Sequence, residues 1–150
     1  MLAINIVYNH KRVIMWDIKV LVVIIPLVAV YLTSLGSPID QTEGDTISFR
    51  PPPWVFAVIW PILLILLGLS WYVADMKWSW MYVAVVVLLA AWSLMYNTIK
   101  ALGLINIAFA WTMTTYLIWA QLYTMASWLL VPLNLWLLFA GVLNVSLMLK

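Results

Sequence analysis

Residues 54–74 read WVFAVIWPILLILLGLSWYVA and contain no charged side chain. An α-helix rises about 1.5 Å per residue, so a stretch of this length can cross the roughly 30 Å hydrocarbon core of a bilayer. The proline run at residues 51–53 prevents a helix from starting earlier, because proline lacks an amide hydrogen and restricts the residue before it. We therefore predict a transmembrane helix over residues 54–74.

Four further apolar stretches have the same character. Prolines inside such stretches are tolerated in lipid when neighbouring groups satisfy the freed carbonyl. Short connections between the stretches favour antiparallel packing of successive helices in a compact bundle. The four predicted spans are residues 19–36, 80–97, 104–126 and 128–149.

The composition supports a membrane protein rather than a soluble one. Hydrophobic residues make up 67% of the 150 residues and charged residues only 8%, whereas soluble domains carry about 25% charged residues. We predict an all-α, multi-pass integral membrane protein, with residues 1–150 forming one domain of five transmembrane helices. The bilayer is then its main partner. The net charge of +2 is not clustered, so we expect no nucleic-acid partner.

The predicted connections are unequal in length, and only residues 37–53, which we call loop one, form a long one. Long loops often carry function. Loop one is interpreted either as a solvated acidic connector or as a lid over a site in the bundle. Five spans place loop one, the connection near residues 98–103 and the C-terminus on the same side. The connection before span five is expected near Ser127.

The chain has eleven tryptophans, and their positions divide them into two groups. Those at span ends are typical of the aromatic belts at membrane interfaces. Those deeper in the spans either fill the packing or offer a flat wall to a flat apolar ligand. The end group is Trp16, Trp54, Trp78, Trp80 and Trp128; the deep group is Trp60, Trp71, Trp92, Trp111, Trp119 and Trp136.

Helical rise places one deep tryptophan and one asparagine at the same depth in the membrane. Trp60 and Asn144 each lie six residues, about 9 Å, from the loop-one side. Trp136, Ala140 and Asn144 are four residues apart and share one stripe of span five. Asparagine is costly in a lipid-facing position, so we expect Asn144 to face the bundle. These residues, with Asn97 and Asn106 nearby, either surround a pocket or form hydrogen bonds between helices.

Two motifs in these spans resemble the signatures of a known family. Residues 51–56 (PPPWVF) and 60–63 (WPIL) are similar to the second-helix signature of the TspO/MBR family, which comprises tryptophan-rich sensory proteins and translocator proteins. Residues 128–132 (WLLVP), with Trp136, Phe139-Ala140 and Leu143-Asn144, resemble its fifth-helix signature. The sequence departs from the family in loop one, where Phe49 stands near a usual tryptophan. It also lacks the cholesterol motif at its C-terminus.

The resemblance implies a five-helix bundle, often dimeric, with a pocket under loop one that takes porphyrins or benzodiazepine-type ligands. It also implies that Trp60 and Trp136 are the two tryptophans linked to light-dependent porphyrin breakdown in some bacterial members. A homodimer is therefore a possible partner state. The expected ligand-binding residues are Trp54, Phe56, Trp60, Leu64, Trp136, Ala140 and Asn144.

The residue types narrow the chemistry. The sole histidine is His10, and the chain has no cysteine. Neither a Ser-His-Asp arrangement nor a haem-iron or metal site can be built inside the spans, so no cofactor or metal is expected and a porphyrin would be a ligand. We expect a binding or sensing protein for porphyrin-like ligands, with a part in tetrapyrrole transport or regulation. The alternatives are a light-dependent porphyrin-degrading enzyme, a transporter of sterol-like lipids, and a structural membrane partner.

Overall fold

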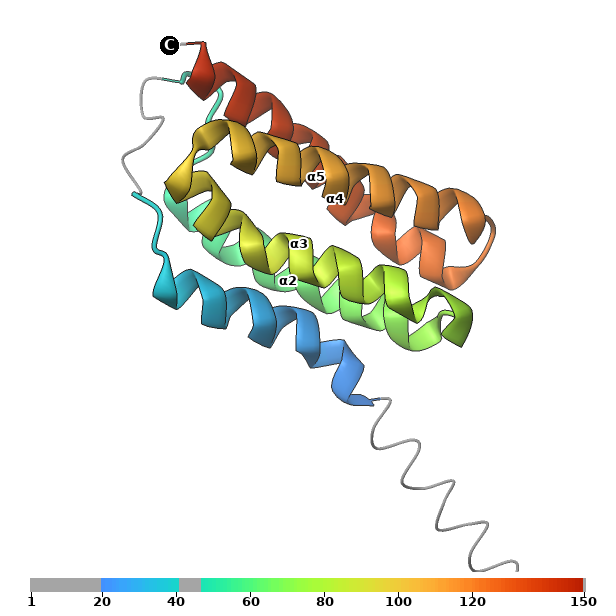
Figure 1. Ribbon diagram of the computed structural model, residues 1–150. Coiled ribbons are helices and arrows are strands. Elements are labelled where there is room, and N and C mark those ends of the chain that lie inside the picture. The colour runs from blue at the N-terminus through green and yellow to red at the C-terminus, as the bar shows by residue number, and fades with distance from the viewer. Residues whose placement is uncertain (1–19, 41–46, 150) are drawn as a thin grey trace, which may run out of the picture.

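The computed structural model of the protein describes residues 20–40 and 47–149, and its regular structure there is entirely helical. Helices of different length follow one another along the chain (Figure 1). The first helix is described from Val20 to Gly36. The later elements are α2 (Pro53–Val73), the short 3₁₀ helix η1 (Met76–Trp78), α3 (Ser79–Thr98), α4 (Lys100–Ala120) and α5 (Met125–Met148).

Four of these segments are long and apolar enough to cross a membrane: α2, η1 joined to α3, α4 and α5. The described part of the first helix is apolar but shorter. Large apolar side chains such as Val58, Ile62 and Leu69 are exposed on the outer face of α2, as expected where the solvent is lipid. No charged side chain within the described ranges is buried. The prediction of an all-α, multi-pass membrane protein is confirmed.

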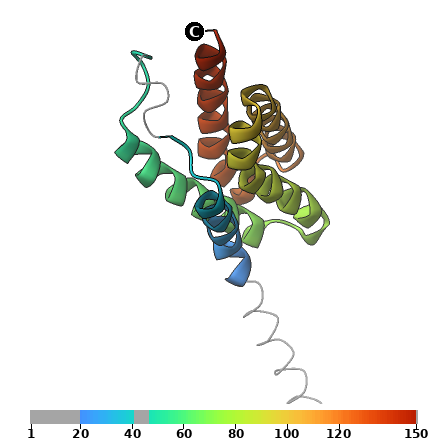
Figure 2. The same ribbon diagram turned by 60° about the vertical axis from the view of Figure 1, so that its left-hand side comes forward.

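The helices pack in the order α3, α4, α5, α2. The first helix closes the bundle beside α2 and α3, because Val23 lies against Gly68 of α2 and Ser37 donates a hydrogen bond to the carbonyl of Ser93 in α3. The described parts of loop one, the α3–α4 break and the C-terminal end of α5 lie at one end of the bundle (Figures 1 and 2). We call it the loop-one end; the α2–α3 connection and the α4–α5 turn mark the opposite end.

The interior of the bundle is a cluster of buried aliphatic side chains. Leu64 of α2, Val85 of α3, Leu117 of α4 and Leu133 of α5 are fully shielded. Aromatic side chains on the same inner faces are partly buried and pack against this cluster. They include Trp60, Trp71, Trp111 and Trp136. These four deep tryptophans therefore face inward. Trp119, which we also placed deep, lies one residue from the end of α4 and is 66% exposed, because α4 ends earlier than predicted.

The first helix crosses α2 with its backbone nearly touching. A Cβ atom at Gly68 would lie 2.6 Å from the carbonyl carbon of Val23 and 2.7 Å from its Cα. Side chains cannot separate two helices at such a distance, so glycine is required at the crossing. Pro26, one turn further along the first helix, is fully buried.

The predicted length of the connection between spans three and four is wrong. We predicted a turn over residues 98–103, with span four starting at residue 104, but α4 starts at Lys100. The chain reverses at the single extended residue Ile99, with φ −147° and ψ 120°. The reversal can be this tight because Gly103 lets α4 approach Tyr96, whose Cα would be 3.0 Å from any added Cβ.

The predicted boundary between spans four and five is also wrong. Span four ends at Ala120 rather than residue 126, and α5 starts at Met125 rather than residue 128. The turn lies at residues 121–124, not at Ser127. Tyr123 adopts a positive φ of 67° there, and the Thr124 hydroxyl accepts a hydrogen bond from the Ser127 amide as the N-cap of α5. Capping, rather than any charge or glycine, sets this boundary.

The remaining span limits in the structure agree with the predicted ones to within one residue. Proline at the first position of α2 costs no hydrogen bond, since that amide has no acceptor within the helix. The predicted span at residues 54–74 is therefore extended to Pro53 and ends at Val73, and the span at 80–97 becomes Ser79–Thr98. Lys19, the expected first residue of span one, lies outside the described residues.

Candidate functional site

Aromatic rings from three segments meet at the loop-one end. Phe49 of loop one contacts Phe139 of α5 edge-on, with ring centroids 6.5 Å apart. Phe139 lies 5.3 Å from Trp136, and Trp136 in turn makes an edge contact of 5.6 Å with Phe56 of α2. We call these four residues the aromatic cluster. It covers the seam between α2 and α5 where loop one passes over it.

Loop one is held over this cluster by its own turn. Ile47 is buried, and its carbonyl accepts a hydrogen bond of 3.1 Å from the Arg50 amide. The Arg50 guanidinium then lies 6.0 Å from the centre of the Phe56 ring, a distance at which a cation is attracted to the ring face. The cluster therefore has a positive charge at its outer edge and apolar rings within.

The other end of loop one is tied to α3. The Asn97 side chain donates to the Ser37 hydroxyl at 2.8 Å and to the Pro38 carbonyl at 3.1 Å. A hollow of about 350 Å³ lies where this segment meets the α3–α4 break. Its lining residues are Pro38, Asp40, Tyr96, Asn97, Thr98 and Lys100. Loop one is thus bonded to α3 at its start and packed on α2 and α5 near its end.

The structure brings several of the predicted site residues to the inner faces of α2 and α5. Trp60 and Trp136 both pack against the interior cluster. Leu64 is completely buried, and Ala140 is 9% exposed. Trp136 and Phe56 are in direct ring contact. These five residues therefore share the α2–α5 side of the bundle.

Two predicted residues behave differently. Trp54 is 66% exposed at the start of α2, as an interfacial anchor is. Asn144 is 5% exposed, but its amide donates 2.8 Å to the Ala140 carbonyl of its own helix. That bond is made within one turn of α5, so it ties no second helix to it.

Some buried indole nitrogens have no acceptor within the described residues, and one of them belongs to the aromatic cluster. The Nε1 atoms of Trp136, Trp92 and Trp111 are buried and have no acceptor among the described residues. Buried polar atoms are nearly always paired in folded proteins, and leaving one unpaired costs about 1–3 kcal/mol. The unpaired Trp136 group lies within the aromatic cluster. A hydrogen-bond donor is therefore available beside a set of aromatic rings.

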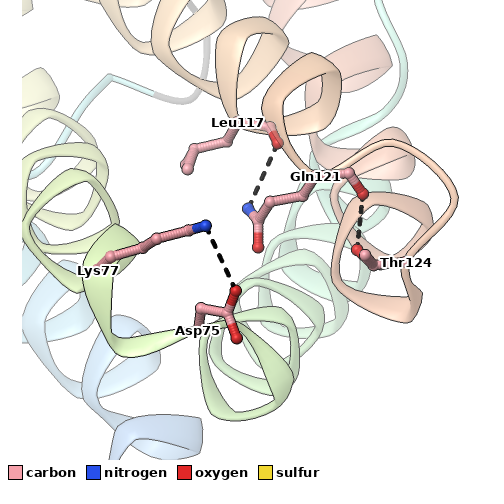
Figure 3. Close-up of polar contacts among 5 residues, drawn as sticks. All are labelled: Asp75, Lys77, Leu117, Gln121 and Thr124. Carbon is pink, nitrogen blue, oxygen red and sulfur yellow. Dashed lines mark hydrogen bonds and ion pairs between the residues drawn. The ribbon is translucent and has the colours of Figure 1, made fainter.

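A polar chain at the opposite end was not foreseen from the sequence. The Gln121 amide donates to the Tyr82 hydroxyl at 3.2 Å and to the Leu117 carbonyl at 3.3 Å. The Tyr82 hydroxyl lies 2.7 Å from the Ser70 hydroxyl, and Ser70 donates to the Ala126 carbonyl. Because Ser70 uses its hydrogen on Ala126, Tyr82 is the donor to Ser70. This chain, in part visible in Figure 3, joins α2, α3, the end of α4 and α5.

Charges at the opposite end stay outside this chain. Lys77 and Asp75 form an ion pair of 3.7 Å, and both side chains are mostly exposed (Figure 3). The Lys77 ammonium also lies 5.3 Å from the Trp78 ring. Exposed pairs of this kind contribute little to stability. The signal for the polar chain was available, since Ser70, Tyr82 and Gln121 are polar residues in apolar stretches.

The chemistry that the described residues could support is limited. They contain no group of three His, Cys, Asp or Glu side chains placed to hold a metal ion. The candidate site instead combines aromatic faces, a buried N–H donor and a cation at the interface. Such a set suits non-covalent binding of a flat, mainly apolar molecule.

Comparison with known proteins gives the same family as the sequence motifs. The family model described as TspO/MBR matches residues 20–149. The chain is 33% identical over 131 residues to the tryptophan-rich protein TspO of Chlorobaculum tepidum, in a match that covers 79% of this chain and 77% of that protein. With a five-helix membrane bundle and inward-facing tryptophans on α2 and α5, the chain belongs to the TspO/MBR family.

Proposed function

We propose that the protein binds flat, apolar ligands of the porphyrin type at the loop-one end, between α2 and α5. The porphyrin is a ligand in this proposal, not a resident cofactor. One observation carries it: the Trp136 N–H is buried without an acceptor among the described residues, on a ring that contacts both Phe56 and Phe139. A ligand that supplies the acceptor removes the cost of that unpaired group.

Ring geometry supports a flat ligand. Phe56 and Trp136 meet at 66°, and Trp136 and Phe139 at 39°. Adjacent rings therefore leave faces, rather than a closed stack, available to a further π-system. Trp60 adds an indole on the same inner side of α2. Stacking against several such faces requires no charged or metal-ligating residue.

Charge placement favours one orientation of the ligand. Arg50 is at the outer edge of the cluster, over Phe56. Charged side chains elsewhere in the described ranges are exposed. A porphyrin would therefore insert its apolar rim toward α2 and α5 and keep its propionate groups near Arg50 and interfacial water, where their desolvation costs least. Membership of the TspO/MBR family agrees with this ligand class.

Titration of the protein in lipid nanodiscs with protoporphyrin IX tests the proposal. Saturable quenching of tryptophan fluorescence is expected. Trp136→Phe keeps an aromatic ring but removes the N–H donor, so it should weaken binding about fivefold to tenfold. Trp128→Phe is the matched control, because Trp128 is on the same helix and is 68% exposed. Linear, unsaturable quenching, or equal affinity in all three proteins, would contradict the proposal.

The same samples separate binding from two further activities. Illumination of the complex that yields a new absorbing product, absent with Trp136→Phe, would indicate light-dependent porphyrin breakdown. Porphyrin flux into proteoliposomes above the protein-free rate would indicate transport. Saturable binding without either result leaves sensing or storage as the activity.

A further inference from the structure

The hollow of about 350 Å³ at the loop-one end shares no lining residue with the aromatic cluster. Its wall comes from the start of loop one and from the α3–α4 break. The wall holds an anion, Asp40, and a cation, Lys100, together with the ring of Tyr96. The Lys100 ammonium lies 6.0 Å from the centre of that ring, so the ring attracts it to the wall. The hollow therefore offers a charge of each sign beside an aromatic surface.

The frame of the hollow is fixed on two sides. Asn97 of α3 donates hydrogen bonds to the Ser37 hydroxyl and the Pro38 carbonyl, which hold the start of loop one in place. Tyr96 is 5% exposed and is backed by Gly103 of α4. A site whose walls are already in position loses little conformational freedom when a ligand enters.

The hollow lies at the membrane interface. Helix α3 ends at Thr98 and α4 begins at Lys100, and both helices are long and apolar enough to cross a membrane. The break between them is therefore at the edge of the hydrocarbon core, at the loop-one end of the bundle (Figure 1). Lipid headgroups are the polar groups present at that level in every bilayer.

An exposed apolar stripe runs down α3 from the hollow. Leu94, Val87 and Val83 lie four, eleven and fifteen residues before Thr98, so the helical repeat places them on the same side as this lining residue. All three are exposed on the surface of the bundle. The stripe extends about 22 Å from Thr98 by helical rise, which is more than half of the roughly 30 Å hydrocarbon core. The charged hollow is thus continuous with a surface that suits acyl chains.

We infer that the hollow binds the headgroup of phosphatidylethanolamine, with the acyl chains of this lipid along the α3 stripe. The lipid phosphate accepts hydrogen bonds from Lys100, and the ethanolamine ammonium donates to Asp40. Both side chains have interactions of their own, and a zwitterion replaces them with groups of the same charges. The site does not depend on the porphyrin site proposed above.

The charges predict which headgroups are rejected. Phosphatidylcholine carries a quaternary ammonium, which has no N–H to donate to Asp40. Phosphatidylglycerol carries a phosphate but no cation, so it leaves a negative charge beside Asp40. Because Asp40 and Lys100 are exposed, each of these effects is modest, and we expect a preference of about threefold for phosphatidylethanolamine over either lipid.

Native mass spectrometry of the full chain tests the inference. The protein in a mild detergent is mixed with equal amounts of the dioleoyl forms of the three phospholipids, and complexes with one lipid are counted. The wild-type protein should retain phosphatidylethanolamine about threefold over each of the others. Asp40→Asn should bring the ratio to phosphatidylglycerol to one or below. Lys100→Gln should reduce retention of all three lipids, because all carry the phosphate.

Matched controls come from the opposite end of the bundle. Asp75→Asn and Lys77→Gln remove the same charges from mostly exposed side chains there, and they should change neither the ratio nor the total retention. Glycerophosphoethanolamine has the same headgroup without acyl chains. Added in equal amount, it should not displace the lipid, because it gains nothing from the α3 stripe.

Three outcomes would overturn the inference. Equal retention of the three lipids by the wild-type protein would show that the hollow does not select a headgroup. Equal effects of Asp40→Asn and Asp75→Asn would assign the change to net charge. Displacement by glycerophosphoethanolamine would show that the hollow holds a soluble zwitterion rather than a lipid. None of these outcomes bears on the porphyrin titration, since no porphyrin is present.

Discussion

Replacement of Gly68 by alanine should displace the first helix from the bundle. The added Cβ would lie 2.6 Å from the carbonyl carbon of Val23 and 2.7 Å from its Cα, with the carbonyl oxygen closer still. All three are backbone atoms, so no side-chain rotation relieves the overlap. Ordinary van der Waals contact of a Cβ atom starts at 3.4 Å. The Cβ would be 2.6 Å from the Val23 carbonyl carbon, 0.8 Å too close, so the two helices must separate by at least 0.8 Å.

The expected loss of stability follows from two opposing terms. Overpacking a well-packed interface typically costs about 1–3 kcal/mol. Alanine is favoured over glycine inside a helix by roughly 0.8–1 kcal/mol. Because the overlap is between backbones, we place the cost near the upper end of its range, which gives a net destabilisation of about 2 kcal/mol. For a chain of this size that corresponds to a fall in Tm of about 4–8 °C.

Thermal unfolding in a mild detergent, followed by circular dichroism, measures the effect. Gly141→Ala is the matched control within a helix, because its Cβ would meet only the Ile107 side chain at an ordinary 3.8 Å. That variant should be neutral or slightly stabilised by the helix-propensity gain. Hydrogen exchange should also be faster in the first helix of Gly68→Ala than in that of the wild type. A Gly68→Ala protein as stable as Gly141→Ala would refute the close crossing of the first helix and α2.

Three further substitutions test the polar contacts. Tyr82→Phe keeps the stack on Trp71 but interrupts the hydrogen-bond chain from Gln121 to Ser70, so it should lower the free energy of unfolding by about 1 kcal/mol. The control Tyr123→Phe, at a site 93% exposed, should leave that free energy unchanged. Equal effects of the two substitutions would argue against the chain. Asn134→Leu removes hydrogen bonds of 2.9 and 2.8 Å to the hydroxyls of Thr114 and Thr115. It should lower the free energy of unfolding by about 0.6 kcal/mol, the average for such bonds in a membrane protein. A gain in stability on denaturant titration would contradict this prediction. Thr124→Ala removes the N-cap of α5 and should cost about 1 kcal/mol, while Thr124→Ser should restore most of it; loss in both would point to packing of the methyl group instead.

Sequence patterns were sufficient to predict the features of the fold that the lipid environment constrains. A charge-free stretch such as residues 54–74 has few alternatives in a bilayer, since only a helix satisfies its backbone internally. The proline run before it also fixed the start of α2 to within one residue. Depth along a helix is equally readable, because rise per residue is constant. Counting therefore predicted the same level for Trp60 and Asn144.

The positions of turns within apolar sequence could not be predicted in the same way. Residues 104–149 contain no charged residue to mark a boundary, and the expected turn was placed too late. The Thr124 cap and the single extended residue Ile99 depend on local hydrogen bonds. Those bonds become favourable only when α3, α4 and α5 pack side by side.

The sequence by itself determined the solvent of this protein and the number and polarity of its helices, because these depend on composition and on residue counts along a regular rise. Tertiary structure alone decided which side of each helix faces the interior and which groups meet there. It turned Trp54 outward, brought Phe49 and Phe139 to Trp136, and left Trp92 Nε1 and Asn106 Oδ1 without partners among the residues that the structure describes. Helices that are apolar on all sides carry no pattern that fixes their rotation; only close packing does so, as at Gly68.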